Sequence, residues 1–362
     1  MSYYHLRRFF LREKIRNKDL ETLFKIIVRK LKLYKVSNNH IIMTKYLYAK
    51  LLNGNVSIFE KTLPTPDENT VIIKLLASGI CRADIKEVSS SRDVPEDRGP
   101  LFGHEINGII TFAGKNTNFQ KDTYVAFNPN ITKNRTTGFA EYMIIRDSKE
   151  TLAKAITSYD KNLNPDKTIL AEPFACIIHS LDILQKNIKI PDIKDKKIAI
   201  IGAGNSGMSF GLLAKHRKAN IKIFNIDDGR LEFAEKIFTK DELVPLSDYK
   251  NYSEKFDVVI ICPTRTNNEV LKIGYSLIKS KGVLHIYGGT RSNDRFLDTK
   301  INIDTIRRNE LIEKIEYKNK TLYLSGAYGF DKKDFNKTFE IIENFPLDKF
   351  ISKVIRFHEF PK

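Results

Sequence analysis

Four residues in the first half of the chain have side chains that could bind a metal ion. Cys81 comes first and is followed by the neighbours His104 and Glu105. Glu172 comes later, directly before a proline. A thiolate, an imidazole and one or two carboxylates can hold Zn²⁺ and leave one coordination position open, as catalysis requires. Each residue also has an ordinary structural explanation, namely packing, capping and the start of a helix. Their spacing is too wide for a local zinc motif, so a metal site is a hypothesis about the fold.

Residues 196–228 have the pattern of a dinucleotide-binding unit. Apolar runs at 198–201 and 221–224 flank Gly202-Ala203-Gly204-Asn205-Ser206-Gly207 and a small apolar segment at 208–214. This order predicts strand, tight turn, helix and strand, which is the context that the glycine pattern requires. Gly202 would make the turn, Gly204 would admit a pyrophosphate, and Gly207 would let the helix pack on its strand. Asn205 and Ser206 would open that helix, whose free N–H groups and dipole attract phosphates.

The end of the second strand bears on the choice of cofactor. A carboxylate about 20 residues beyond the glycines normally binds the ribose 2′-hydroxyl, and Asn225 stands at that place. Asp227 and Asp228 follow and would repel a 2′-phosphate, whereas Arg230 could attract one. On balance the sequence favours NAD, with NADP as the alternative.

Later strands of the same unit are expected at 258–262 and 283–287. Thr264 and Arg265 follow the first, and Gly288 to Arg291 follow the second. These residues therefore belong at the carboxyl edge of a parallel sheet, where cofactor and substrate meet. Arg265 and Arg291 are candidates for holding a phosphate, although both could equally face solvent.

The rest of the chain supplies a second kind of domain. Short apolar runs separated by turn residues predict strands of an antiparallel, barrel-like domain at 46–52, 71–77, 106–112, 124–127 and 140–145. A helix is expected at 171–185, and after the parallel unit a strand at 321–324, a helix at 333–344 and a strand near Val354. The nucleotide-binding unit thus looks inserted. The expected domains are an extension at 1–42, a catalytic domain at 43–188, a Rossmann domain at 189–318 and a return at 319–362.

Length and composition set further bounds. A chain of 362 residues with 41% hydrophobic residues can fill two cores. Its three cysteines suit a reducing compartment and exclude a zinc lobe built from four cysteines. The net charge of +17 suggests anionic ligands, but the lysines are scattered and no nucleic-acid motif accompanies them. No signal peptide or membrane span is recognisable, so the cytoplasm is the expected location.

Residues 1–42 form a basic extension. Apolar residues recur at helical spacing within 6–35, among many lysines and arginines. Such a helix could lie on an anionic membrane surface or dock on a partner. It could also pack on its own protein, or lie upstream of a true start at Met43.

Five motifs in order carry a resemblance to a known family. Gly-Ile-Cys-x-x-Asp begins at 79, Gly-His-Glu at 103, Glu-Pro at 172, the glycine pattern at 202 and Leu-Ser-Gly-Ala-Tyr-Gly at 324. From about Tyr46 onward the chain resembles the zinc-containing branch of the medium-chain dehydrogenase/reductase superfamily. Within it the chain is most similar to polyol dehydrogenases such as sorbitol dehydrogenase, and to alditol-phosphate dehydrogenases of bacterial surface-polymer synthesis. The resemblance implies an α/β protein in which a Rossmann doubly wound parallel sheet is inserted into a mostly antiparallel, GroES-like catalytic domain.

The resemblance also implies roles for single residues. Cys81, His104 and Glu172 would bind one catalytic zinc, with Glu105 as a neighbouring or exchangeable carboxylate. The zinc would act as a Lewis acid while a hydride passes between an alcohol and NAD or NADP. Arg82 would contact the cofactor pyrophosphate. Relatives are commonly homo-oligomers, which is therefore expected here.

The chain departs from the family in three places. Ala83 stands where relatives carry a serine or threonine that relays a proton. Residues 128–138, which hold four cysteines in many relatives, contain none, so no structural zinc is expected. The chain stops at Lys362, where relatives continue into a helix and a last strand, so a shortened product is expected. The alternatives left open are a dehydrogenase of amino alcohols resembling threonine dehydrogenase, and a nucleotide-binding homologue with degraded catalysis.

Overall fold

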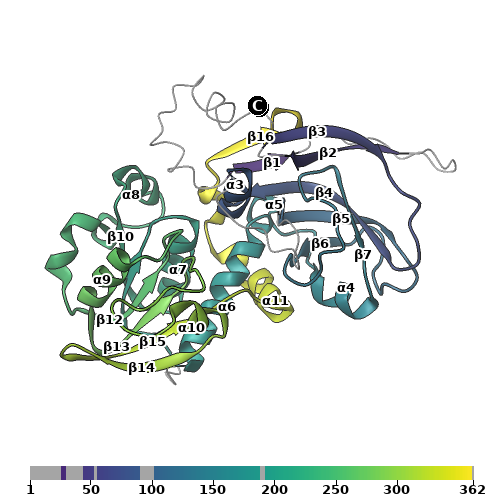
Figure 1. Ribbon diagram of the computed structural model, residues 1–362. Coiled ribbons are helices and arrows are strands. Elements are labelled where there is room, and N and C mark those ends of the chain that lie inside the picture. Colours follow the sequence, from purple (N-terminus) through teal and green to yellow (C-terminus); the bar gives the residue numbers. More distant parts are fainter. Residues whose placement is uncertain (1–25, 30–43, 53–54, 90–101, 188–191, 361–362) are drawn as a thin grey trace. The chain divides into compact units, whose positions relative to one another are not determined.

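The chain divides into two compact units. The computed structural model describes residues 26–29, 44–52, 55–89, 102–187 and 192–360 (Figure 1). The outer unit comprises Met1–Glu172 and Asp331–Lys362, and the inserted unit comprises Pro173–Phe330.

The outer unit is built on a mostly antiparallel sheet. Among the described residues its strand order is β16 (Lys353–Arg356), β1 (Ile26–Arg29), β4 (Thr70–Ile80), β5 (Glu105–Ala113), β6 (Tyr124–Phe127) and β8 (Ile156–Ser158), and β7 (Tyr142–Arg146) also pairs with β4. A separate hairpin joins β2 (Lys45–Leu52) and β3 (Asn55–Thr62). Alternating apolar residues of these strands, such as Val71, Ile73 and Val125, are fully buried in one core.

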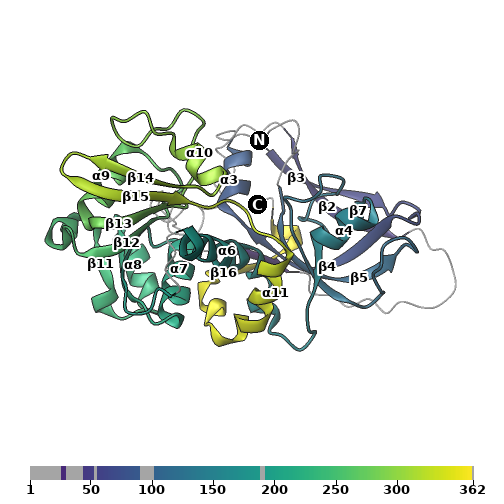
Figure 2. The ribbon, with the colours of Figure 1, turned by 90° about the horizontal axis from the view of Figure 1, so that it is seen from below.

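The inserted unit holds a mostly parallel sheet. Its strand order is β11 (Leu243–Pro245), β10 (Asn220–Asn225), β9 (Lys197–Ile201), β12 (Phe256–Ile261), β13 (Ile278–Ile286), β15 (Lys320–Gly326) and β14 (Ile312–Tyr317). Among the described strands of this sheet, only β14, at one edge beside β15, runs antiparallel to its neighbour (Figure 2). The chain passes from β9 to β10 on one side and returns to β12 on the other. This reversal is the topological switch point at which open α/β sheets bind ligands.

Helices connect and cover these strands. The outer unit contains α3 (Arg82–Val88), α4 (Lys149–Ala155), α5 (Pro165–Thr168) and α11 (Lys332–Ile341), and the inserted unit contains α7 (Asn205–His216), α8 (Asp228–Ala234), α9 (Asn268–Leu277) and α10 (Ile303–Arg308). Helix α6 (Ala171–Asn187) begins at the boundary between the units. In the inserted unit, α7 packs on β9 and β10 and α9 packs on β12 and β13. In the described part of the chain, no helix is long and apolar enough to cross a membrane.

Two expectations drawn from the pattern need correction. Residues 26–29, assigned to a basic helix by their spacing, form strand β1 between β4 and β16; the rest of the segment 6–35 lies outside the described residues. Strand β15, expected to belong to the returning segment, pairs in parallel with β13 of the inserted sheet. Along the chain, the inserted unit therefore begins after Glu172 and ends before Asp331, whereas the pattern placed these boundaries after residue 188 and before residue 319. Short apolar strands look alike in both units, so their spacing alone does not reveal which sheet they join.

Candidate functional site

An antiparallel pair of strands brings three of the proposed metal ligands together. Strand β4 ends at Ile80 and β5 begins at Glu105, and the register sets Gly79 opposite Glu105. Cys81 follows β4 directly, whereas His104 directly precedes β5. The ends of two neighbouring antiparallel strands that meet in this way place residues distant in sequence side by side.

The three side chains have the geometry of a metal site. One potential ligand atom each from Cys81, His104 and Glu105 lies within 4.8 Å of the others. His104 and Glu105 are buried, and Cys81 is partly exposed. Thiolate sulfur, imidazole nitrogen and carboxylate oxygen together form a donor set that suits Zn²⁺. The residues present therefore fit a zinc ion with an open position.

Asp84 ties the two segments that carry these side chains. It lies in the first turn of α3, where its Oδ2 accepts the backbone N–H of Cys81 at 2.7 Å. Its Oδ1 accepts the backbone N–H of Gly103 at 3.0 Å and lies 3.4 Å from Nδ1 of His104. A carboxylate on one ring nitrogen of a histidine fixes the ring and leaves the other nitrogen for a metal.

The same contacts control the protonation of His104. Burial lowers the pKa of its imidazole, but the charges of Asp84 and Cys81 and their hydrogen bonds to the ring outweigh that effect and hold the pKa well above 6.5. A metal ion bound to the second ring nitrogen would take the place of that proton.

Glu172, the fourth candidate ligand, is not part of this group of side chains. It is buried in the first turn of α6 and does not join the Cys81, His104 and Glu105 group among the described residues. Arg82 is the exposed first residue of α3, directly after Cys81.

The glycine turn in the inserted unit has the geometry that a pyrophosphate needs. Gly202 has a φ of +106°, which favours glycine. A Cβ on Gly207 would lie 1.8 Å from the Gly202 carbonyl oxygen, so α7 approaches the turn as closely as only glycine permits. Gly204, the N-cap of α7, faces open space, in which the nearest atom is Nη1 of Arg230, 3.9 Å from an added Cβ. Asn205 and Ser206 begin α7 and are partly exposed beside this opening.

Asn225 supports the turn from β10. Its Oδ1 accepts the N–H of Ala203 at 3.0 Å, and its Nδ2 donates to the Asp227 carbonyl at 2.9 Å. Asp227 is the N-cap of α8 and accepts the N–H of Arg230 at 3.1 Å. The amide at 225 thus binds backbone within the unit. The neighbouring Ile226 is 83% exposed, an apolar surface beside the turn.

Candidate residues after β12 and β13 are fixed by contacts within the unit. Arg265 donates to both carboxylate oxygens of Asp294, and the Arg291 N–H also donates to Asp294, at 2.6 Å. A Cβ on Gly288 would lie 2.4 Å from the Pro263 carbonyl oxygen, so β12 and β13 approach closely at their carboxyl ends. Thr264 is exposed on the same edge. The Arg265 guanidinium already has a carboxylate partner, which weakens its case as a phosphate ligand.

Comparison with known proteins identifies the family. A family model for the alcohol dehydrogenase GroES-like domain matches residues 67–155. D-arabinitol dehydrogenase 1 of Uromyces fabae is 25% identical over an alignment of 282 positions that covers 68% of this chain and 75% of the relative. Sorbitol dehydrogenase of Bacillus subtilis (strain 168) is 26% identical over 291 residues, 73% of this chain and 80% of the relative. The chain belongs to the zinc-type medium-chain dehydrogenases.

A solved structure shares the fold of this chain. Galactitol-1-phosphate dehydrogenase from Escherichia coli matches 83% of this chain and 89% of its own length with a TM-score of 0.59 and 15% identity. The family and the fold class expected from the motifs are thus confirmed. The chain is an enzyme of the NAD(P)-dependent zinc-type alcohol and polyol dehydrogenase family.

For this medium-chain dehydrogenase, sequence reasoning missed three residues beside the candidate sites. Asp84 was visible only as the last position of a motif, and its contacts with Gly103 and His104 depend on the fold of the 102–104 loop. Ile226 is one apolar residue among polar ones, and no pattern marks it. Arg135 stands in a segment noted only for its lack of cysteine, although it contacts the Gly103 carbonyl oxygen.

Proposed function

We propose that this dehydrogenase transfers a hydride between NAD(P) and a secondary alcohol of a polyol or alditol, free or phosphorylated. The observation that carries the proposal is the grouping of Cys81, His104 and Glu105 within 4.8 Å at the ends of β4 and β5. When bound, zinc would supply Lewis-acid chemistry toward an alcohol or carbonyl oxygen, and the nicotinamide would take or give the hydride.

The chain's own residues would prepare the site. Cys81, His104 and Glu105 would hold the metal, and Glu172 is the remaining candidate ligand. Asp84 would keep the His104 ring oriented through its contact with Nδ1. Arg82, exposed at the start of α3, would supply a cation toward the cofactor pyrophosphate. Ala83 offers no hydroxyl, so a proton would not be relayed at that position.

For the cofactor we propose NAD. Open space above Gly204 and the start of α7 would admit the pyrophosphate, with Arg230 beside it. The carboxylate of Asp228, exposed after Asn225, would disfavour the extra phosphate of NADP. The exposed Ile226 would offer an apolar surface to the adenine.

The polyol class rests on the names of the relatives. D-arabinitol and sorbitol are the substrates that the names of two relatives give, and galactitol 1-phosphate is given by the solved structure with the same fold.

Metal analysis and a substrate panel test the proposal. Purified protein should hold about one zinc per chain, as a single catalytic site requires. Cys81→Ser should lose both the metal and NAD-linked turnover on a panel of free and phosphorylated polyols. Threonine in the same panel tests the amino-alcohol alternative. A chain that binds neither zinc nor NAD(P)H would contradict the proposal.

The same preparation can separate the two carboxylates. Glu105→Gln should weaken zinc affinity, because Glu105 lies in the grouped set. Glu172→Gln measured beside it reports whether α6 also supplies a ligand. If only Glu172→Gln lost zinc, Glu105 would not be a ligand.

A further inference from the structure

The loop that carries His104 is held from two sides. On one side, Asp84 accepts the N–H of Gly103, as described above. On the other side lies the segment Arg135–Gly138, which comes from the part of the chain that holds cysteines in many relatives. This segment contains none of the proposed metal ligands, yet it contacts the loop that carries His104.

Hydrogen bonds join this segment to the backbone just before His104. Nη1 of Arg135 donates to the carbonyl oxygen of Gly103 at 3.4 Å. It also donates to the carbonyl oxygen of Thr136, the next residue in the chain, at 3.1 Å. The Thr137 hydroxyl donates to the Phe102 carbonyl oxygen at 3.3 Å. Two consecutive carbonyl groups of the loop are thus held by two side chains of one segment.

Close backbone packing reinforces these bonds. Gly103 has a φ of +66°, and a Cβ there would lie 2.4 Å from the Phe139 nitrogen. A Cβ on Gly138 would lie 2.0 Å from the Gly103 carbonyl oxygen. The Ser78 hydroxyl, on β4, also donates to the Gly138 carbonyl at 2.5 Å. The backbones of the loop and the segment are therefore packed as closely as only glycine permits at Gly103 and Gly138.

Arg135 also brings a positive charge to a group of buried acids. The carboxylates of Asp84 and Glu87, both buried on α3, interact with its guanidinium. Burial lowers the pKa of Arg135 to about 10, and the two carboxylates oppose that shift, so the group stays cationic at neutral pH. Its Cζ lies 5.4 Å from the centre of the Phe127 ring, which supports the guanidinium.

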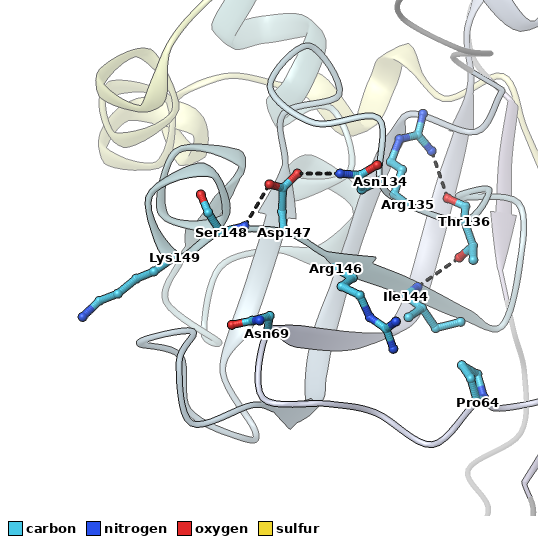
Figure 3. Close-up of a pocket in the computed structure, with 10 residues that line it drawn as sticks. All are labelled: Pro64, Asn69, Asn134, Arg135, Thr136, Ile144, Arg146, Asp147, Ser148 and Lys149. Atoms are coloured by element: carbon cyan, nitrogen blue, oxygen red, sulfur yellow. Dashed lines mark hydrogen bonds between the residues drawn. The ribbon is translucent and has the colours of Figure 1, made fainter.

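The segment is itself anchored to the sheet. The Thr136 hydroxyl accepts the N–H of Ile144 at 3.0 Å, and Asp147 accepts hydrogen bonds from Thr132 and Asn134. Figure 3 shows the contacts of Thr136 with Ile144 and of Asn134 with Asp147, and shows Arg135 pointing away from the neighbouring Arg146. These residues line a hollow of about 1010 Å³. Arg146 instead bonds to the exposed Asp67, 3.0 Å away.

We infer that Arg135 is a positioning residue for the metal site, and that the segment Arg135–Gly138 holds the His104 loop in place by hydrogen bonds and charge. The inference rests on the proposed function, because it needs a metal at Cys81, His104 and Glu105. Without Arg135, Asp84 and Glu87 would lose a cation, and the Gly103 carbonyl would lose a donor. The imidazole would then be held less firmly toward the metal.

The test compares matched arginine variants of the full chain. Arg135→Met and Arg146→Met remove guanidinium groups from neighbouring residues that line the same hollow. Zinc affinity is measured by competition with a chelator, and Co²⁺ is then loaded to record its d–d absorption. We expect Arg135→Met to weaken zinc binding about 10- to 100-fold, as loss of a supporting contact does, and to shift the Co²⁺ bands. Arg146→Met should match the unsubstituted protein in both.

Two further variants keep the inference testable if Arg135→Met does not fold. Arg135→Lys keeps the charge but lacks the fork that reaches Gly103, so its zinc affinity should be intermediate. Thr137→Val removes the bond to Phe102 without touching a charge and should weaken zinc binding by a smaller factor. Unchanged zinc affinity and Co²⁺ spectrum in a folded Arg135→Met, or in both of the milder variants, would overturn the inference. Failure of the unsubstituted chain to bind zinc would instead contradict the proposed function on which it rests.

Discussion

At the scale of single residues, Asp84 joins the two segments that carry the proposed metal ligands. One carboxylate accepts the N–H of Cys81 and that of Gly103 and lies beside the His104 ring. An anion is needed there because both backbone contacts are donors. An asparagine side chain would turn one of its own N–H groups toward a donor.

Replacement of Asp84 should therefore weaken the metal site more than the fold. We expect Asp84→Asn to lower zinc affinity by about 10- to 100-fold, the range found when a partner of a ligating histidine is lost. Isothermal titration of the metal-free protein with zinc would measure this. Asp166→Asn, in α5 of the same unit, is a control that should leave affinity unchanged. Equal zinc affinity in the two variants would contradict the role given to Asp84.

The glycines of the turn give a prediction with opposite outcomes for two similar changes. Gly204 has an extended backbone and open space at its Cβ, so Gly204→Ala should fold with unchanged stability but bind NADH more weakly. Gly207→Ala would set a Cβ 1.8 Å from a carbonyl oxygen and should destabilise the inserted unit itself. Thermal melting and NADH fluorescence titration separate the two effects. Unimpaired NADH binding by Gly204→Ala would exclude a pyrophosphate above that residue.

Residue types and their order indicated candidate side chains for the chemistry but not how the fold groups them. Cys81, His104 and Glu105 were marked by their chemistry, and the antiparallel pairing of β4 and β5 explains why they meet. The contacts that Asp84 and Arg135 make with Gly103 could not be predicted, because they depend on a loop whose path no periodicity describes. Asn225 likewise stood where a ribose ligand was expected, yet its amide binds Ala203 and Asp227.

At the scale of elements, segments with a strong apolar pattern were assigned to the correct helix or strand. The expected strand at 124–127 coincides with β6, and the expected helix at 171–185 lies within α6. Strand β14 was missed because its sequence, IEKIEY, mixes charged and apolar residues, as an exposed edge strand does. Strand β1 was assigned to a helix because four residues cannot show which period they follow, and its pairing with β4 and β16 decides its form.

One helix depends on a buried lysine from a neighbouring strand. Nζ of Lys320, on β15, donates to the carbonyl oxygens of Tyr275 and Ile278 at the end of α9, at 3.0 and 2.7 Å. It also lies 2.8 Å from the carboxylate of Glu254. A cation at the C-terminus of a helix satisfies carbonyls that lack partners in the helix and complements its dipole.

Lys320→Met should therefore destabilise the inserted unit. Two carbonyl groups would lose a charged donor, which we expect to cost about 2 kcal/mol of unfolding free energy. Lys314→Met on β14 is the matched control, since its ammonium is exposed and 3.8 Å from Glu316; that loss should stay below about 0.5 kcal/mol. Chemical denaturation followed by circular dichroism measures both. Similar losses in the two variants would rule out a special role for Lys320.

At the scale of the whole molecule, the two units have separate apolar cores. One core lies around Ile73 and Phe127 in the outer unit, and the other around Phe224 and Leu284 in the inserted unit. Proteins with separate cores often unfold in more than one step. The sequence predicted an inserted unit from the change of pattern but assigned β15 to the returning segment, because short apolar strands look alike in both units.

A buried histidine should make the stability of the inserted unit depend on pH. His285 on β13 is fully buried between the hydroxyls of Ser180, 2.8 Å from Nε2, and Ser325, 3.2 Å from Nδ1. Burial, aided by the charge of Arg307, lowers its pKa to about 3. In the unfolded chain its pKa would be about 6.5, so between these values the unfolded chain binds one more proton.

Stability should thus be retained above about pH 6.5 and lost as the pH falls toward 3. This histidine alone should cost about 1.4 kcal/mol by about pH 5.5, the free energy of protonating it in the unfolded chain. Denaturation midpoints of the unsubstituted protein and of His285→Gln, measured from about pH 7.5 down to about pH 5.5, isolate the effect because glutamine does not titrate. The unsubstituted protein should lose more stability over that range than the variant, even though glutamine lowers stability at neutral pH by disturbing the serine contacts. Parallel pH profiles would mean that the folded His285 takes up its proton over the same pH range as the unfolded chain does, or that its surroundings open before the unit unfolds.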